Sequence, residues 1–263
     1  MPPGPSERRP PVEHAFLDHP GPLAFAHRGG AALNPENTWA SFGHAVDLGY
    51  RYLETDARVT SDGVVLAFHD ATLDRMCDRT GEITRLPWSE VRRARIAGEH
   101  VPVRMDELLE AHPDVRINID AKDDAVLEPL ARVLERADAL ERVCIASFSD
   151  ARLVRARRLL GSGLCVAGGP RAVARIRLSP GGRGIRPMWV ACVQVPVKLR
   201  SMTLVDSRFL RAAARSGVAV HVWTIDDAHE ITRLLDLGVT GIMTDRPDVL
   251  RDVLVARGEW HPR

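Results

Sequence analysis

The sequence predicts a closed α/β barrel, on the evidence of its length, its alternating pattern and its lack of a dividing linker. The chain has 263 residues, close to the roughly 250 that one such barrel usually takes. Short apolar, β-rich segments alternate eight times with longer segments of helical period, which is typical of parallel strands joined by helices. An open, doubly wound sheet is the alternative that this pattern leaves open.

Each element is expected where the hydrophobic pattern changes from one period to the other. The eight strands are expected at 23–26, 50–59, 115–121, 143–147, 164–167, 190–195, 218–223 and 241–243, with a short extra strand at 64–68 beside the second. Helices are expected at 37–48, 106–111, 124–139, 150–160, 206–216 and 227–237, with two more starting at Arg171 and near Pro247.

Two segments fall outside this alternation. Residues 70–103 are mostly polar and include an arginine-rich helical stretch, so we expect a small insertion after the second strand, beside the active-site face. The chain begins MPPGPSERRPP, which is polar and proline-rich and lacks the apolar segment of a signal peptide. We therefore expect a disordered tail over residues 1–20 and a single barrel domain over 21–263.

The composition excludes several classes of function. The 36 basic and 35 acidic residues give a formal net charge of +1. A charge this small does not indicate a protein that binds nucleic acid or an anionic membrane through its overall charge. No apolar run reaches the roughly 18 residues of a membrane span, and we expect a cytoplasmic location. The sequence does not indicate an oligomeric state. Only two basic residues are lysines, Lys122 and Lys198; Lys198 has no role that the sequence indicates.

The cysteines do not form a recognisable metal or disulfide framework. They show no CxxC spacing, and three of them lie in apolar runs, so we expect small buried hydrophobic side chains. The four cysteines are Cys77, Cys144, Cys165 and Cys192. The glycines likewise form no GxGxxG after a strand, so a dinucleotide site is not supported.

Charged and polar residues stand at the ends of the predicted strands, where barrel enzymes place their catalytic groups. Side chains alternate along a strand, so residues two apart share one face, and acids from two strands can meet at the barrel mouth. The residues at these strand ends are His27, Arg28, Glu54, Asp56, His69, Asp120 and Lys122. A further histidine, His221, lies deeper in its strand, where we expect a barrel-core residue with its hydrogen bonds satisfied.

Three carboxylates at one mouth would repel one another unless a cation lies between them. Glu54, Asp56 and Asp120 offer only oxygen ligands, which favours Mg²⁺ or Ca²⁺ over Zn²⁺. The alternative is a network of salt bridges in which Arg28 and Lys122 neutralise the same acids.

The other strand-end residues suit chemistry on a phosphate. Arg28 can fork onto phosphate oxygens, and Lys122 can add a compact positive charge. His27 and His69 have the pKa range of a general acid and a general base.

Sequence blocks in this order resemble the glycerophosphodiester phosphodiesterase family. The first is AHRGGAALNPENT, which ends at Thr38, and the second is LETDARVTSDGVVLAFHDATLDR, which starts at Leu53. The later blocks are NIDAK, ASF, VQVP, VWT and GIMTDRPD, and together they cover most of residues 24–248. The resemblance implies a TIM (β/α)8 barrel with a small insertion after the second strand.

The resemblance also implies roles for individual residues. It implies a divalent metal on Glu54, Asp56 and Asp120, an acid–base pair of His27 and His69, and phosphate binding by Arg28 and Lys122. The family usually has glutamate where Asp120 stands, so the shorter acid could ligate the metal through water. Trp223 is similar to the family's aromatic wall for the alcohol, and Glu36 is expected to orient His27 or Arg28.

The expected activity is hydrolysis of a small-molecule glycerophosphodiester to sn-glycerol 3-phosphate and an alcohol. The nucleophile is water or a glycerol hydroxyl that first forms a cyclic phosphodiester. One alternative is a related phospholipase acting on lysophospholipid or sphingolipid head groups; it needs an apolar surface at the barrel mouth, which the arginine-rich insertion does not offer. The other alternative is a non-catalytic phosphodiester-binding module.

Overall fold

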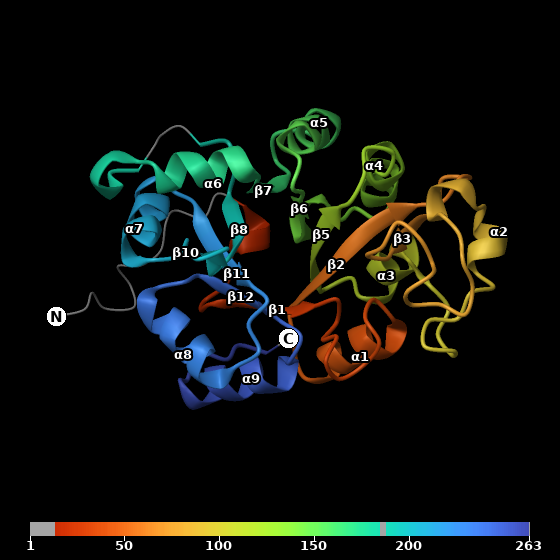
Figure 1. Ribbon diagram of the computed structural model, residues 1–263, viewed down its shortest axis with the longest axis horizontal. Coiled ribbons are helices and arrows are strands. Elements are labelled where there is room, and N and C mark those ends of the chain that lie inside the picture. The colour runs from red at the N-terminus through yellow and green to blue at the C-terminus, as the bar shows by residue number, and fades with distance from the viewer. Residues whose placement is uncertain (1–13, 185–187, 263) are drawn as a thin grey trace.

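The computed structural model describes residues 14–184 and 188–262, and these residues form the expected closed barrel (Figure 1). Eight parallel strands follow one another around the barrel, and β1 pairs with both β12 and β2 to close it. Their bounds are β1 (Leu23–His27), β2 (Tyr52–Val59), β5 (Arg116–Ala121), β6 (Val143–Ala146), β7 (Cys165–Gly168), β8 (Cys192–Pro196), β11 (Ala219–Trp223) and β12 (Gly241–Thr244). The open-sheet alternative is therefore excluded.

The helices cover the outside of the barrel and begin at the predicted starts or within three residues of them. Asp206 and Asp227 illustrate the reason: each accepts a hydrogen bond from the backbone N–H three residues on, so it caps the helix and stands before its first turn. The helices that follow barrel strands are α1 (Trp39–Asp47), α4 (Leu127–Arg136), α5 (Asp150–Leu160), α6 (Pro170–Arg177), α7 (Ser207–Arg215), α8 (Ala228–Leu237) and α9 (Pro247–Ala256).

The barrel interior is packed with side chains from alternate strand positions. Phe25 and Tyr52 fill one part of it with aromatic rings, and three cysteines fill another. Cys144, Cys165 and Cys192 are buried free thiols, as expected, and their sulfur atoms lie within 4.8 Å of one another. His221 is buried against Phe25 as predicted, but neither of its ring nitrogens has a hydrogen-bond partner among the described residues.

The predicted insertion is a small lobe with its own apolar core. The lobe begins before the predicted 70–103, with the extra strand β3 (Val65–Ala67), which pairs antiparallel with β2. The chain returns through α2 (Trp88–Val91) to β4 (Val103–Arg104), and α3 (Met105–Ala111) follows. Its core consists of Leu66, Phe68, Leu73, Ile83, Val91, Ala94 and Ile96. The lobe stands beside the carboxyl end of β2.

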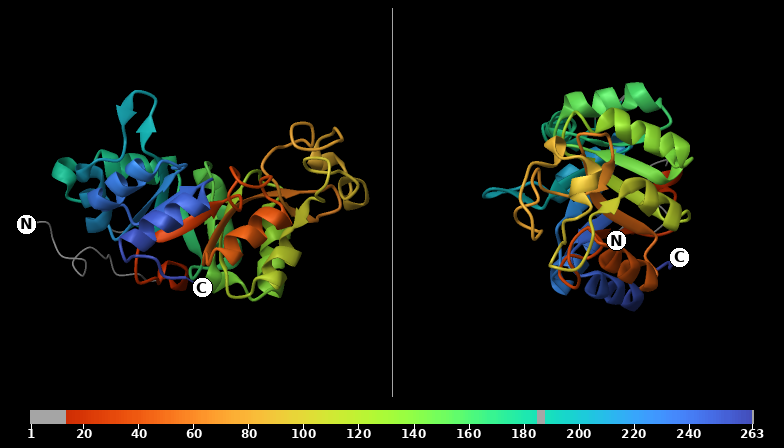
Figure 2. Two further views of the ribbon diagram at one scale, coloured as in Figure 1. Left: turned by 90° about the horizontal axis from the view of Figure 1, so that it is seen from below. Right: turned by 90° about the vertical axis from the view of Figure 1, so that its right-hand side faces the viewer.

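A second projection was not expected from the sequence. β9 (Lys198–Leu199) and β10 (Met202–Thr203) form a short antiparallel hairpin after β8. In Figure 2 the hairpin and the insertion project from the same side of the barrel, with the mouth between them. Strands of two exposed residues carry no alternation, so no periodic pattern marked the hairpin.

The last part of the segment predicted as a disordered tail is folded. Ala15–Leu17 forms a turn of 3-10 helix, and Phe16 is fully buried against the rings of Phe25 and Tyr52. The hydroxyl of Tyr52 donates a hydrogen bond to the backbone oxygen of Phe16 at 2.9 Å. Residues 14–20 therefore belong to the folded domain, whereas residues 1–13 of the predicted tail lie outside the described part, as do residues 185–187 and 263. Among the described helices, none is long and apolar enough to cross a membrane.

Candidate active site

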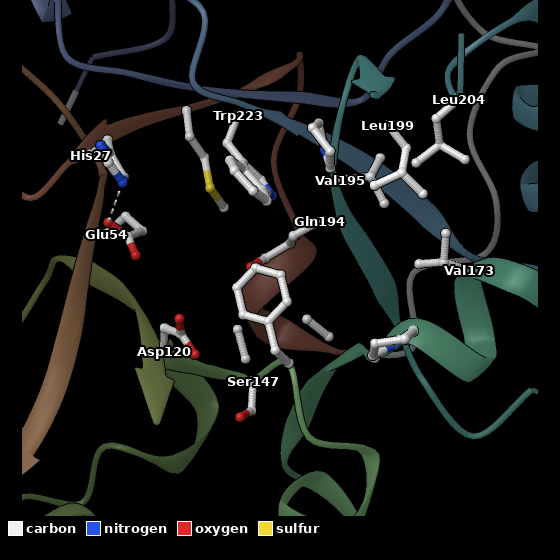
Figure 3. Close-up of a pocket in the computed structure, with 18 of the residues that line it drawn as sticks. His27, Glu54, Asp120, Ser147, Val173, Gln194, Val195, Leu199, Leu204 and Trp223 are labelled. Atoms are coloured by element: carbon white, nitrogen blue, oxygen red, sulfur yellow. Dashed lines mark ion pairs between the residues drawn. The ribbon is translucent and has the colours of Figure 1, made fainter. Parts of the chain in front are cut away.

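The predicted site residues converge on one cavity at the carboxyl ends of β1, β2 and β5. The cavity has a volume of about 700 Å³, and Figure 3 shows His27, Glu54 and Asp120 on one side of it. The predicted residues that line it are His27, Arg28, Glu54, Asp56, His69, Asp120, Lys122 and Trp223. Glu36 stands behind them.

Each of the two histidines has one ring nitrogen held by a carboxylate. The Nδ1 of His27 lies 2.7 Å from Asp245 Oδ1, and the Nδ1 of His69 lies 2.6 Å from Asp70 Oδ1. A carboxylate on Nδ1 favours the proton there and leaves Nε2 for chemistry. Burial lowers the pKa of His27, but the charges of Glu54 and Asp245 outweigh burial and raise that pKa above its ordinary value.

Asp245 is a residue that the sequence analysis did not assign. It lies in the GIMTDRPD block at the end of β12, 218 residues from His27 in the chain. Its own backbone N–H donates to Asp226 Oδ1 at 2.7 Å, which fixes the turn that carries it. Its position after a barrel strand was the available signal, but its pairing with His27 depends on barrel closure between β1 and β12.

The turn after β1 places Arg28 at the mouth. Arg28 and Gly29 both have positive φ, 51° and 82°, which glycine adopts without strain. A Cβ on Gly29 would lie 2.5 Å from Ser41 Oγ, so helix α1 leaves room only for glycine there. The close approach of this turn to α1 therefore explains the glycine that follows Arg28.

Arg28 and Lys122 are already paired with the acids of the site. The Nζ of Lys122 lies 2.8 Å from Asp56 Oδ1 and 2.7 Å from Asp120 Oδ2, and the Nε of Arg28 lies 3.1 Å from Asp56 Oδ2. Burial raises the pKa of Asp56, but the two cations outweigh burial and hold it below its ordinary value. The salt-bridge alternative is thus present in the structure.

Two acids have room for a further cation beside these salt bridges. Glu54 lies outside the pairs made by Arg28 and Lys122, and its Oε2 is 3.7 Å from the Nε2 of His27. Burial raises the pKa of Glu54 to about 7, and the nearby charges of Asp56 and Asp120 add to the effect. The buried Oδ1 of Asp120 has no hydrogen-bond partner among the described residues. A hard cation bound by oxygen ligands would satisfy both groups, so the residues present fit a divalent metal beside Glu54 and Asp120. The carboxylate oxygens of the site lie less close together than the sulfur atoms of Cys144, Cys165 and Cys192.

Glu36 connects Arg28 to the residues around His69. Its carboxylate lies 3.2 Å from Arg28 Nη1 and 2.6 Å from Arg75 Nη2, and Arg75 also pairs with Asp70. Of the two expectations for Glu36, the structure shows the contact with Arg28; the partner of His27 is Asp245. Glu36 and Asp70 therefore brace Arg28 and His69 through Arg75.

The opposite side of the cavity is apolar. Val173 and Leu178 line it from α6 and the residue that ends it, Leu199 comes from the hairpin, and Leu204 follows the hairpin. In Figure 3, Val173, Leu199 and Leu204 lie across the cavity from His27. Trp223 stands at the boundary, with its ring 6.1 Å from that of Phe148 and nearly perpendicular to it. No pattern in the sequence marked this apolar side.

Comparison with known proteins agrees with the arrangement. Residues 27–249 match the model of the glycerophosphoryl diester phosphodiesterase family. The probable glycerophosphodiester phosphodiesterase 2 of Mycobacterium tuberculosis is 42% identical, over 93% of this chain and 95% of the relative. Lysophospholipase D GDPD1 of Mus musculus is 28% identical, over 87% of this chain and 85% of the relative.

Solved structures share the fold. A putative glycerophosphoryl diester phosphodiesterase from Silicibacter pomeroyi superposes with a TM-score of 0.78 at 19% identity, covering 95% of this chain and 99% of that one. A phosphodiesterase from Oleispira antarctica, solved in complex with the product sn-glycerol-3-phosphate, gives 0.75 at 20% identity, covering 89% and 97%. The family match over most of the chain and the 42% identical relative lead to one conclusion: this chain belongs to the glycerophosphoryl diester phosphodiesterase family and is an enzyme of that family.

Proposed function

We propose that this enzyme hydrolyses glycerophosphodiesters to sn-glycerol 3-phosphate and an alcohol, with His27 and His69 as its acid–base pair. The observation that carries the proposal is the pair of histidines, each held at Nδ1 by a carboxylate, on one cavity with Arg28 and Lys122. The names of the relatives, and the product bound to the Oleispira antarctica structure, support this substrate class.

Arg28 and Lys122 are suited to hold the phosphate. Glu36 and Asp56 fix the guanidinium of Arg28 from two sides, so it meets a phosphate in one orientation with little loss of side-chain entropy. Burial lowers the pKa of Lys122, but Asp56 and Asp120 outweigh burial and raise it, so the ammonium stays charged. Together they neutralise charge on the non-bridging oxygens, where it develops during phosphoryl transfer.

The histidines move the protons. One takes a proton at Nε2 from the nucleophile, which is water or the neighbouring glycerol hydroxyl, as that oxygen bonds to phosphorus. The other donates a proton from Nε2 to the leaving alkoxide as its bond to phosphorus breaks. If the glycerol hydroxyl attacks, this step forms a cyclic phosphodiester, and water then opens the ring to sn-glycerol 3-phosphate with the two histidines in exchanged roles. Asp245 and Asp70 hold the rings in place and stabilise whichever imidazole is protonated.

Glu54, Asp56 and Asp120 would hold a divalent cation, Mg²⁺ or Ca²⁺, which supplies positive charge beside the phosphate. The support for this part of the proposal is the raised pKa of Glu54 and the unpartnered Oδ1 of Asp120. Turnover before and after treatment with EDTA, followed by return of Mg²⁺ or Ca²⁺, tests it. Activity that is indifferent to the chelator would contradict a metal requirement.

The test of the acid–base pair is turnover of glycerophosphocholine, followed as release of sn-glycerol 3-phosphate. We expect His27→Ala and His69→Ala each to lower kcat by about 10²–10⁴. His229→Ala, on the exposed face of α8, is the matched control and should keep the rate of the unmodified enzyme. Retention of that rate by His27→Ala would overturn the mechanism.

The apolar side of the cavity favours a second candidate substrate, a lysophospholipid or sphingolipid. The sequence offered no apolar surface on the insertion, but Val173, Leu204 and Trp223 supply such a surface on the other wall of the cavity. The Mus musculus relative is named a lysophospholipase D. A comparison of kcat/KM for lysophosphatidylcholine and glycerophosphocholine distinguishes the two candidates. The cytoplasmic location stays a prediction.

A further inference from the structure

The most exposed hydrophobic side chains of the described residues gather at the entrance of the cavity. Five large hydrophobic side chains are more than 45% exposed in the described part, and four of them line the cavity. These four, Phe148, Leu178, Leu199 and Met202, are between 47% and 76% exposed, and we call them the apolar rim. The fifth is Val255 on α9. Exposed apolar groups that cluster in this way mark an interaction surface.

The hairpin presents half of this rim to solvent. Leu199 and Met202 face each other across β9 and β10, and the hairpin stands clear of the barrel on the side of the mouth (Figure 2). The apolar pair is therefore displayed away from the barrel and not folded onto it.

Positive charge accompanies the apolar pair on the hairpin. Lys198 and Arg200 are both exposed beside Leu199, and neither has a salt bridge within the described ranges. The charge of Lys198 acts on Glu230, but that carboxylate already binds Arg233 through two contacts of 2.7 Å. The carboxylates that line the cavity all belong to the strand-end site, so the rim itself has none.

We infer that the apolar rim, with Lys198 and Arg200, docks this enzyme on the surface of a phospholipid bilayer. Apolar side chains bordered by lysine and arginine match the order of acyl chains and phosphates in a membrane interface. The cavity opens within the rim, so a bilayer in contact with the rim faces the cavity entrance. The formal charge of +1 on the whole chain does not oppose this contact, because the cations act locally. The inference does not depend on which phosphodiester the enzyme hydrolyses.

Flotation with vesicles tests the surface directly. The vesicles contain either phosphatidylcholine alone or equal parts of phosphatidylcholine and phosphatidylglycerol. We expect the unmodified enzyme to float with both and more strongly with the anionic vesicles. The double substitution Leu199→Ser with Met202→Ser should lower the bound fraction about tenfold, the loss expected for two apolar side chains that leave the interface, and Val255→Ser should leave it unchanged.

A second variant separates charge from apolar contact. Lys198→Glu with Arg200→Glu should lose its preference for anionic vesicles while its turnover of soluble glycerophosphocholine stays unchanged. Thermal melting shows that each variant is folded. Failure of the unmodified enzyme to float, or equal flotation of the Leu199/Met202 variant, would overturn the inference. Flotation without any turnover of glycerophosphocholine would support the docking surface and contradict the proposed function.

Discussion

The two sides of the cavity are built on different principles. The charged side rests on β1, β2 and β5, and ion pairs connect its residues to one another. Glu36, for example, binds both Arg28 and Arg75. The apolar side rests on β6 to β11 with α6 and the hairpin, and its side chains meet the cavity through non-directional contacts. If the charged side binds the phosphate as proposed, its ion pairs fix the position of that group. The alcohol group of the substrate would then meet an apolar surface that single substitutions can change.

After the two histidines, the largest effect on the charged side is expected from Asp120. Asp120→Asn should lower kcat by about 100-fold and raise the Mg²⁺ concentration for half-maximal activity, because it removes a proposed ligand charge. Asp120→Glu, which restores the length usual in the family, should lower that concentration. Asp124→Asn, at an exposed acid paired with Arg152, is the control. A metal response of Asp120→Asn equal to that of the unmodified enzyme would exclude Asp120 as a ligand.

A smaller effect is expected from Asp245, which acts through His27. Asp245 raises the pKa of His27 by its hydrogen bond and its charge, so Asp245→Asn should lower that pKa. The limb of the pH–rate profile that reports His27 should then move to lower pH, whether His27 is the acid or the base. We expect kcat at the optimum to fall about tenfold as the ring loses its orienting partner. Asp248→Asn is the control and should leave the pH–rate profile unchanged. A profile of Asp245→Asn whose limbs do not move would contradict the role of Asp245.

The smallest effect is expected on the apolar side. Val173→Ser removes apolar surface from the wall, and we expect the ratio of kcat/KM for lysophosphatidylcholine to that for glycerophosphocholine to fall about fivefold. Val154→Ser, on the outer surface of α5, is the matched control and should leave the ratio unchanged. An unchanged ratio for Val173→Ser would remove the lysophospholipid from consideration.

The charged side was predictable because its residues lie close together in the sequence. Glu54 and Asp56 are two residues apart on one strand, as are Asp120 and Lys122, and the period of a strand places each pair on one face. The barrel itself followed from the alternation of buried strands with amphipathic helices. Patterns of this kind depend only on residues that are near one another in the chain, so they can be recognised without knowing the tertiary structure.

The rest depends on contacts that no local pattern records. The pairing of His27 with Asp245 spans 218 residues, and it exists only because the last strand closes against the first. Leu178, Leu199 and Met202 look like ordinary core residues in the sequence, yet a helix end and a short hairpin leave them at the rim. Phe16 shows the reverse case, because its polar, proline-rich neighbourhood concealed a buried anchor.

The three cysteines inside the barrel have a practical consequence. Alkylating reagents attack thiolates that they can reach, and Cys144, Cys165 and Cys192 are shielded by the closed wall of strands. Cys77 is partly accessible, but burial raises its thiol pKa to about 11, so it reacts slowly near neutral pH. A brief pulse of maleimide followed by mass measurement therefore counts the molecules whose barrel has opened, because only their interior thiols gain the mass of the reagent.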